Sequence, residues 1–159
     1  VSHTEEVPSF LPDRFEPGTP NIPGILGLHA ALCDLEQTDM GKLHQHELEL
    51  TQYFINGLMQ MDPSESTLRA IGKHNTIERT SVVSVQTLQT DMARVAYEMD
   101  DTYGIMTRVG LHCAPSAHKT LGTYPEGTIR FSFGPENTHH EVDLALHALA
   151  EITGSPYHL

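Results

Sequence analysis

The hydrophobic period of this chain changes repeatedly between that of a helix and that of a strand, and this alternation most constrains the fold. Four segments repeat apolar residues at the helical spacing: 24–35, 43–61, 90–104 and 138–154. Four others are short and alternate, or are rich in β-branched residues: 66–72, 81–87, 105–111 and 128–134. Their order predicts an α/β (α+β) two-layer sandwich, a small mostly antiparallel sheet with helices on one face.

End signals support the two later helices. Thr90 is a candidate N-cap for the third helix, and Gly104 is a stop signal at its end. Thr138 and Glu141 have the spacing of a capping box, which fixes the start of the last helix, and Gly154 ends it.

The first 23 residues contain five prolines, which neither a helix nor a central strand accommodates along its length. Residues 1–23 are therefore predicted to form an extended arm, and residues 24–159 a single domain. The chain does not begin with Met, which indicates that it was cut from a longer protein.

The charge excludes two classes of partner. Nine Lys and Arg stand against 21 Asp and Glu, for a net charge of -12, so nucleic acid and anionic membranes would be repelled. There is no apolar run long enough to span a bilayer, and the two cysteines give no disulfide framework. A soluble, cytoplasmic protein with reduced thiols is expected.

Two arginines interrupt strand patterns in a way that a buried core does not require. The period of two in 128–134 directs Ile129 and Phe131 to one side of the strand and Arg130 to the other. Arg108 has the same relation to its neighbours in 105–111. Both guanidinium groups are therefore expected on the helix-free face, as clamps for a carboxylate. The alternative is a solvated residue or half of a salt bridge at each position.

Cys113 follows one of these strands and precedes a short helix pattern that has Pro115 in its first turn and Gly122 at its end. Unpaired N–H groups at a helix start stabilise a thiolate, so Cys113 is a candidate nucleophile. The alternative is a small buried cysteine that fills a loop.

Other reactive side chains have simpler interpretations. Cys33 lies inside the first amphipathic helix and is expected in the core. Lys119, in "SAHKT", resembles the lysine pattern of pyridoxal-phosphate enzymes, but it falls within a short helix and is expected on the surface. No metal site is expected, because the paired histidines diverge or crowd one helix turn: His44 with His46, and His139 with His140.

Three segments carry a resemblance to a known family: "RFEPGTPNIPGILGLHAAL" (14–32), "GIMTRVGLHCAPSAHKTLGT" (104–123) and "GTIRFSFGPENTHHEVDLALHAL" (127–149). They resemble the C-terminal portion of class V aminotransferase-like enzymes, in the cysteine desulfurase and selenocysteine lyase branch. The resemblance covers roughly residues 10 to 152. One departure is Glu136, where the family often has an aromatic residue.

The resemblance implies a pyridoxal 5'-phosphate enzyme of which residues 24–159 are the C-terminal small domain. The large domain, with the Schiff-base lysine, would be absent from this chain and would be its partner, and the enzyme would be a homodimer. Cys113 matches the cysteine that receives sulfur, and Arg130 the residue that binds the substrate carboxylate. Thr19, after Gly18, matches the threonine that reaches the cofactor phosphate of the neighbouring subunit. Arg108 and His112 are weaker matches beside the cysteine.

The function implied is conversion of cysteine to alanine with a persulfide on the enzyme, passed on to a sulfur acceptor protein. This chain alone is expected to be inactive. Two alternatives stay open at this point: a class V aminotransferase or selenocysteine lyase of other specificity, and a non-catalytic binding module that kept the fold.

Overall fold

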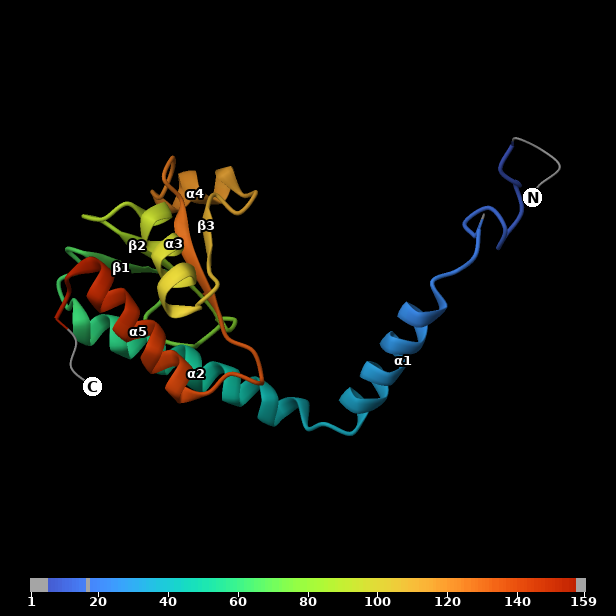
Figure 1. The fold of residues 1–159 in the computed structure, drawn as a ribbon, viewed down its shortest axis with the longest axis horizontal. Coiled ribbons are helices and arrows are strands. Elements are labelled where there is room, and N and C mark those ends of the chain that lie inside the picture. The colour runs from blue at the N-terminus through green and yellow to red at the C-terminus, as the bar shows by residue number, and fades with distance from the viewer. Residues whose placement is uncertain (1–5, 17, 157–159) are drawn as a thin grey trace. The chain divides into compact units, whose positions relative to one another are not determined.

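The computed structural model describes residues 6–16 and 18–156, in two compact units, Val1–Met40 and Gly41–Leu159. The first unit contains helix α1 (Ile22–Glu36), labelled in Figure 1. The Asn21 side chain accepts a hydrogen bond from Gly24 N at 3.1 Å, and Pro23 fits the first turn, where its missing N–H has no intrahelical partner to lose. The predicted arm therefore ends earlier than residue 23. Its residues 1–5 and 17 lie outside the described part of the chain.

The second unit contains the sheet and the remaining helices. Its helices are α2 (Met40–Met61), α3 (Met92–Tyr103), α4 (Pro115–Leu121) and α5 (His139–Thr153). Its strands are β1 (Leu68–Ile71), β2 (Val82–Thr87), β3 (Arg108–Gly110) and β4 (Thr128–Ser132). The strand order is β1-β2-β4-β3 and all three pairs are antiparallel, so the predicted α/β two-layer architecture is confirmed.

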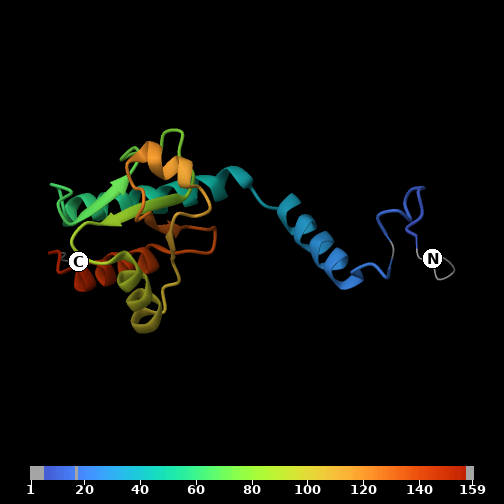
Figure 2. The same cartoon turned by 90° about the horizontal axis from the view of Figure 1, so that it is seen from above.

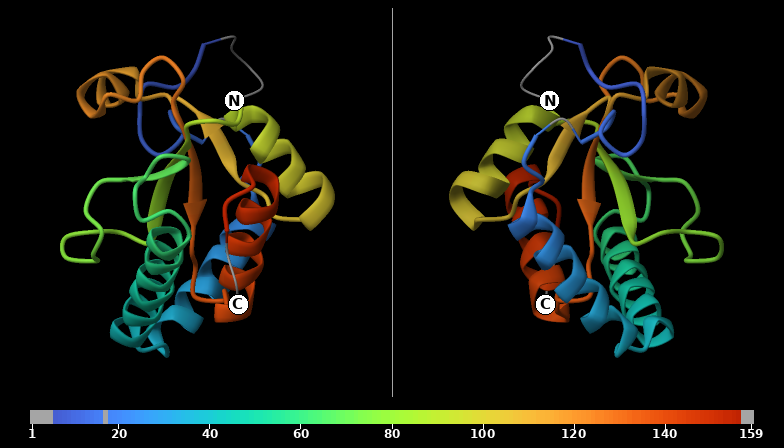
Figure 3. Two further views of the ribbon diagram at one scale, coloured as in Figure 1. Left: turned by 90° about the vertical axis from the view of Figure 1, so that its left-hand side faces the viewer. Right: turned by 90° about the vertical axis from the view of Figure 1, so that its right-hand side faces the viewer.

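Helices cover one face of this sheet. Figure 1 shows α2 and α5 along one side of the sheet and α4 at the opposite edge of the unit, and Figure 2 shows the same unit from above. In Figure 3, α2 lies beside the β1 and β2 half of the sheet, and α5 and α3 lie beside the β3 half. The ring of Phe54 on α2 packs against Phe131 and Phe133, with centroids 4.8 Å and 5.3 Å apart.

The core follows the period of two along each strand. Six strand residues that face the helices are buried: Leu68, Ala70, Val83, Val85, Ile129 and Phe131. Their neighbours point to the opposite face, which we call the open face. On α5 the predicted stripe is buried at Val142, Ala145 and Leu149 and partly buried at Ile152.

Most of the residues predicted to begin or end a helix do so in the structure. The capping box of Thr138 and Glu141 is present, and Gly104 and Gly154 end their helices in the left-handed conformation that glycine adopts without strain. The Thr90 cap is wrong, because the side chain of Asp91 accepts the hydrogen bond from Arg94 N at 2.8 Å. The predicted strands 105–111 and 128–134 are also longer than β3 and β4.

Candidate active site

The open face carries two arginines side by side. Arg108 on β3 and Arg130 on β4 are register partners, so their side chains leave the same face of adjacent strands. Arg108 is exposed and Arg130 is half-buried. The predicted placement of both guanidinium groups on the helix-free face is therefore confirmed.

Neither guanidinium has a hydrogen bond or ion pair with any residue that the structure describes. The four strands contain no Asp or Glu at all. Two like charges directly opposite each other repel, and an anion bound between them would offset this repulsion. The salt-bridge alternative is excluded within the described residues.

Cys113 lies in a turn between β3 and α4. Both His112 and Cys113 have left-handed backbone, with φ of 50° and 59°. This conformation costs about 1–2 kcal/mol for each residue other than glycine, so contacts elsewhere must hold the turn in place. Ala114 is the N-cap of α4, which places the thiol one residue before it. The side chain of Cys113 is exposed, which excludes the buried-cysteine alternative within this unit.

His112 connects this turn to β4. Its Nε2 lies 3.1 Å from the carbonyl oxygen of Thr128 and 3.2 Å from the hydroxyl of that residue. Burial lowers the pKa of His112, and the positive charges of Arg130 and Arg108 lower it further. The imidazole is therefore neutral at pH 7, and it lies in the electrostatic field of both arginines.

Further anchors hold the segment between Cys113 and β4, and sequence reasoning missed them. His118 on α4 is buried, and its Nδ1 lies 2.6 Å from the hydroxyl of Thr123. Gly127 donates to the carbonyl of Thr123 at 2.7 Å and accepts from the side chain of Gln86 at 3.3 Å. A Cβ at Gly127 would collide with the backbone of Gly110 at the end of β3, so only glycine fits there.

Two further residues with predicted roles lie in the first unit. Gly18 and Thr19 are both exposed, and a Cβ at position 18 would meet nothing within 4 Å. Pro17, which precedes them, lies outside the described residues. Since the two units are separate bodies, Cys113, Arg108 and Arg130 form one group of site residues, and Thr19 with Gly18 forms another.

The predicted burial of Cys33 and the predicted exposure of Lys119 can both be compared with the structure. The prediction of Cys33 as a core residue is wrong within its unit, because α1 has no buried residue, and the Cys33 sulfur lies 3.8 Å from Nδ1 of His29 one turn earlier. Lys119 is exposed, as predicted, and its ammonium lies 5.1 Å from the centre of the Tyr124 ring.

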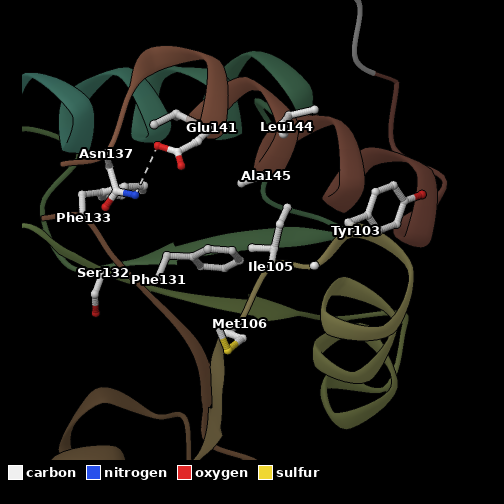
Figure 4. A pocket seen from close by; sticks show the side chains of 12 residues that line it. Tyr103, Ile105, Met106, Phe131, Ser132, Phe133, Asn137, Glu141, Leu144 and Ala145 are labelled. Atoms are coloured by element: carbon white, nitrogen blue, oxygen red, sulfur yellow. Dashed lines mark hydrogen bonds between the residues drawn. The ribbon is translucent and has the colours of Figure 1, made fainter.

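A cavity of about 450 Å³ lies on the helix side of the sheet, between β4, α5 and the segment after α3. Figure 4 shows Phe131, Ile105 and Met106 at its apolar end and Glu141 with Asn137 at its polar end. Glu141 accepts from the backbone N–H of Thr138, which lowers the pKa of its carboxyl. Neither Cys113 nor Arg130 lines this cavity.

Residues 6–16 and 18–156 contain no cluster of three or more His, Cys, Asp or Glu side chains arranged to hold a metal ion. Over the same residues, no helix has the length and apolar character needed to cross a membrane.

Comparison with known proteins identifies the family. Residues 1–145 match the sequence profile described as aminotransferase class-V. The chain belongs to the class-V aminotransferase family. A protein of Staphylococcus epidermidis named as a probable cysteine desulfurase is 33% identical over 151 residues, which are 95% of this chain and 35% of the relative. A Pyrococcus abyssi protein of the same name is 34% identical over 91% of this chain and 34% of its own length.

Solved structures of this class-V family have the same fold. The apo cysteine desulfurase of Thermococcus onnurineus NA1 superimposes with a TM-score of 0.77 and 34% identity, over 90% of this chain and 34% of that one. The Escherichia coli cysteine desulfurase CsdA, in its S-sulfonic acid form, gives a TM-score of 0.67 and 26% identity, over 88% of this chain and 32% of that one. The chain thus spans about one third of the length of the relatives that it matches. This matched third is similar in sequence and fold to cysteine desulfurases.

Proposed function

We propose that this chain is the C-terminal part of a pyridoxal-phosphate-dependent cysteine desulfurase. The observation that carries the proposal is the unpaired Arg108 and Arg130 pair on the open face, next to the turn that exposes Cys113. An anion clamp and an accessible thiol are the two groups that removal of sulfur from an amino acid requires of this part of the enzyme. The similarity to proteins named cysteine desulfurase supports the same reaction.

The remaining two thirds of the enzyme would supply the large domain and the cofactor lysine. The residues present here fit a limited role toward pyridoxal phosphate: the exposed hydroxyl of Thr19 is available to a phosphate, and Gly18 leaves space beside it. Lys119, stacked on Tyr124, is not the lysine that holds the cofactor. When bound, pyridoxal phosphate supplies an electron sink for the α-carbon of the amino acid. We propose that Thr19 reaches the phosphate of the second subunit of a homodimer.

Arg130 would bind the α-carboxylate of the substrate. Its strand is central in the sheet and its neighbours Ile129 and Phe131 are buried, so the guanidinium projects from a rigid base. A fork of two parallel hydrogen bonds fixes both the position and the orientation of a carboxylate. The substrate sulfur is then held in one place, which is the main contribution that a clamp makes to rate. Arg108 would add a second positive charge beside it.

Cys113 would accept the sulfur atom. Its thiolate attacks the sulfur of bound cysteine, so that a sulfur–sulfur bond forms as the carbon–sulfur bond breaks. The electron pair of the broken bond stays with the β-carbon, which takes up a proton and leaves as part of alanine. The product on the protein is a persulfide, which a sulfur acceptor protein would remove by attack of its own thiolate. The proposed location is the cytoplasm, where acceptor thiols stay reduced.

The experiment that tests this proposal uses the full-length protein and its Cys113→Ser variant, with Cys33→Ser as the matched control. The parent and the control should release alanine from cysteine without any α-keto acid, and Cys113→Ser should not. Serine lacks a soft, partly ionised nucleophile, although it is close to cysteine in size. Alanine release at the parent rate by Cys113→Ser, or release only when an α-keto acid is added, would instead support an aminotransferase.

A further inference from the structure

The turn that carries Cys113 does not hold itself in place. Two consecutive left-handed residues, His112 and Cys113, are unfavourable for L-amino acids, and such backbone persists only where neighbouring groups fix it. Within the turn, the Ala114 N–H donates to the carbonyl of Leu111 at 2.8 Å. The N-cap residue Ala114 has no side chain with which to cap α4. The side chain of His112 supplies a contact that fixes the turn from outside.

The hydrogen bond of His112 also determines which ring nitrogen carries the proton. The carbonyl of Thr128 only accepts, so Nε2 must be the protonated nitrogen that donates to it. Because burial and the adjacent Arg130 keep the ring neutral, Nδ1 then has no proton. This Nδ1 is buried without a hydrogen-bond partner among the described residues. A neutral ring adds no positive charge beside the thiol, so its effect on Cys113 is one of position.

The partner of His112 lies on the strand that carries the anion clamp. Thr128 and Arg130 are two residues apart on β4, so they leave the same face of the strand. Thr128 is buried, and its strand β4 pairs with both β2 and β3. The backbone at Thr128 is therefore held rigidly within the sheet. One hydrogen bond thus connects the backbone next to the thiol with the backbone next to the clamp.

The other anchors of this segment act at its far end. The contacts of His118 with Thr123, and of Gly127 with Gln86, hold α4 and the loop after it. They lie five or more residues beyond Cys113 along the chain. The His118 ring also lies beside the His112 ring, with centroids 5.8 Å apart. Loss of His112 would remove this contact together with the bond to Thr128 and so free the turn, while the bond of His118 to Thr123 keeps α4 attached.

We infer that His112 is a positioning residue, whose Nε2–H bond to Thr128 holds the Cys113 thiol at a fixed place relative to Arg130. This inference rests on the proposed desulfurase function. The proposed function thereby gains a residue that contacts neither substrate nor cofactor and that acts only by holding the turn in place.

The test compares His112→Ala and His112→Gln in the full-length protein, with His140→Ala on the exposed start of α5 as the control. The amide of glutamine can replace the Nε2 donor, and alanine cannot. For His112→Ala we expect kcat for alanine release to fall on the order of 10- to 100-fold, the cost of a small misplacement of a reacting group. KM for cysteine should change less than about threefold, because Arg130 stays in place. His112→Gln should recover most of the lost kcat.

A second measurement follows the turn without any reaction. Hydrogen exchange of the Ala114 amide should be faster in His112→Ala than in the parent and should return to the parent rate in His112→Gln. If the parent releases no alanine, the desulfurase proposal fails, while this measurement still reports on the turn. An unchanged kcat in His112→Ala would overturn the inference. So would a glutamine variant as impaired as the alanine one, or a rise in KM that parallels the loss of kcat, since each indicates only a structural role.

Discussion

At the residue level, we propose that the arginines of the open face serve binding rather than stability. Arg108 and Arg130 are adjacent, like-charged and without an anionic partner among the described residues. A chain of net charge -12 has ample carboxylates with which to pair them, yet it places none on the four strands. The pair is therefore available to an anion from outside the described residues.

Arg130→Ala should raise KM for cysteine in the full-length protein, with a smaller effect on kcat. A lost charge-assisted bidentate contact is worth about 2 to 4 kcal/mol, or roughly 30- to 1000-fold in binding. Steady-state kinetics measures this, with Arg94→Ala on α3 as the control, because Arg94 pairs with Glu98 far along the chain from the site. Normal kinetics of the Arg130 variant, or its failure to fold, would contradict the binding role.

Asp62 shows the opposite arrangement, a carboxylate whose bonds serve the fold. It accepts from the backbone N–H of Thr67 at 2.6 Å and of Leu68 at 3.0 Å, and from the hydroxyl of Ser64 at 2.8 Å. Burial by itself raises the pKa of Asp62, but these bonds, first those from Leu68 and Thr67, outweigh it and hold the pKa well below its usual range. The charged carboxylate therefore fixes the turn between α2 and β1.

The stability that Asp62 contributes should depend on pH. Because its pKa is lower in the folded state, the contribution is full above the unfolded pKa of about 3.9 and is lost as the pH falls below it. Asp62→Asn should lower the free energy of unfolding at pH 7 by about 1 to 3 kcal/mol and by much less near pH 2. Urea unfolding of the 159-residue chain at both pH values measures this. An equal loss at the two values would show that the charge is not the cause.

At the scale of elements, the sequence predicted what depends on local chemistry. Helix ends at Gly104 and Gly154, the capping box at Thr138, and the opposite faces of Arg130 and Phe131 all follow from neighbouring residues. The short length of β3 could not be predicted, because it depends on how much of β4 lies beside it.

Two contacts that depend on how the chain folds back were missed for the same reason. His118 was assigned no role, since its partner Thr123 is reached only after the helix ends at a left-handed glycine. Gly127 was likewise assigned none, because its need for glycine comes from the backbone of Gly110 on another strand. The sequence signal that could have found the contact of His118 with Thr123 is the close spacing of His, Gly and Thr in "AHKTLGT".

The packing of α2 on α5 leads to a prediction about Gly57. A Cβ at this position would collide with the side chain of Leu146, which is fully buried and has little room to move. Gly57→Ala should therefore lower the free energy of unfolding by about 1 to 3 kcal/mol, although alanine is the better helix former.

The matched control is Gly27→Ala on α1, where a Cβ would meet nothing within 4 Å. Its effect should be neutral or stabilising by up to about 1 kcal/mol. Urea unfolding of the 159-residue chain reports both changes. Equal effects of the two substitutions would mean that the close approach of α2 and α5 is not a constraint.

In the molecule as a whole, α1 stands out because its apolar residues are uncovered within their own unit. Leu26 and Leu28 are 61% and 62% exposed, and Leu32 is 51% exposed, in a helix with no buried residue. A helix this apolar is ordinarily buried in a larger core. Since the chain spans about one third of its relatives, we propose that the missing large domain covers α1.

Leu28→Glu should therefore have different effects in two contexts. In the 159-residue chain the side chain is already exposed, so the free energy of unfolding should change by less than about 0.5 kcal/mol. In the full-length protein, burial of this leucine is worth about 1.5 to 3 kcal/mol, and loss of that burial should destabilise the protein. Urea unfolding of both forms checks this, and an unchanged full-length protein would show that the large domain does not cover α1.

If Cys113 accepts sulfur from cysteine, the mass of the peptide that contains Cys113 should increase. The full-length protein is incubated with cysteine in the absence of an acceptor, and its persulfides are trapped by alkylation and digested. We expect one additional sulfur atom on the Cys113 peptide, none on the Cys33 peptide, and one alanine released for each sulfur trapped. Alanine release with an unmodified Cys113 peptide would contradict it.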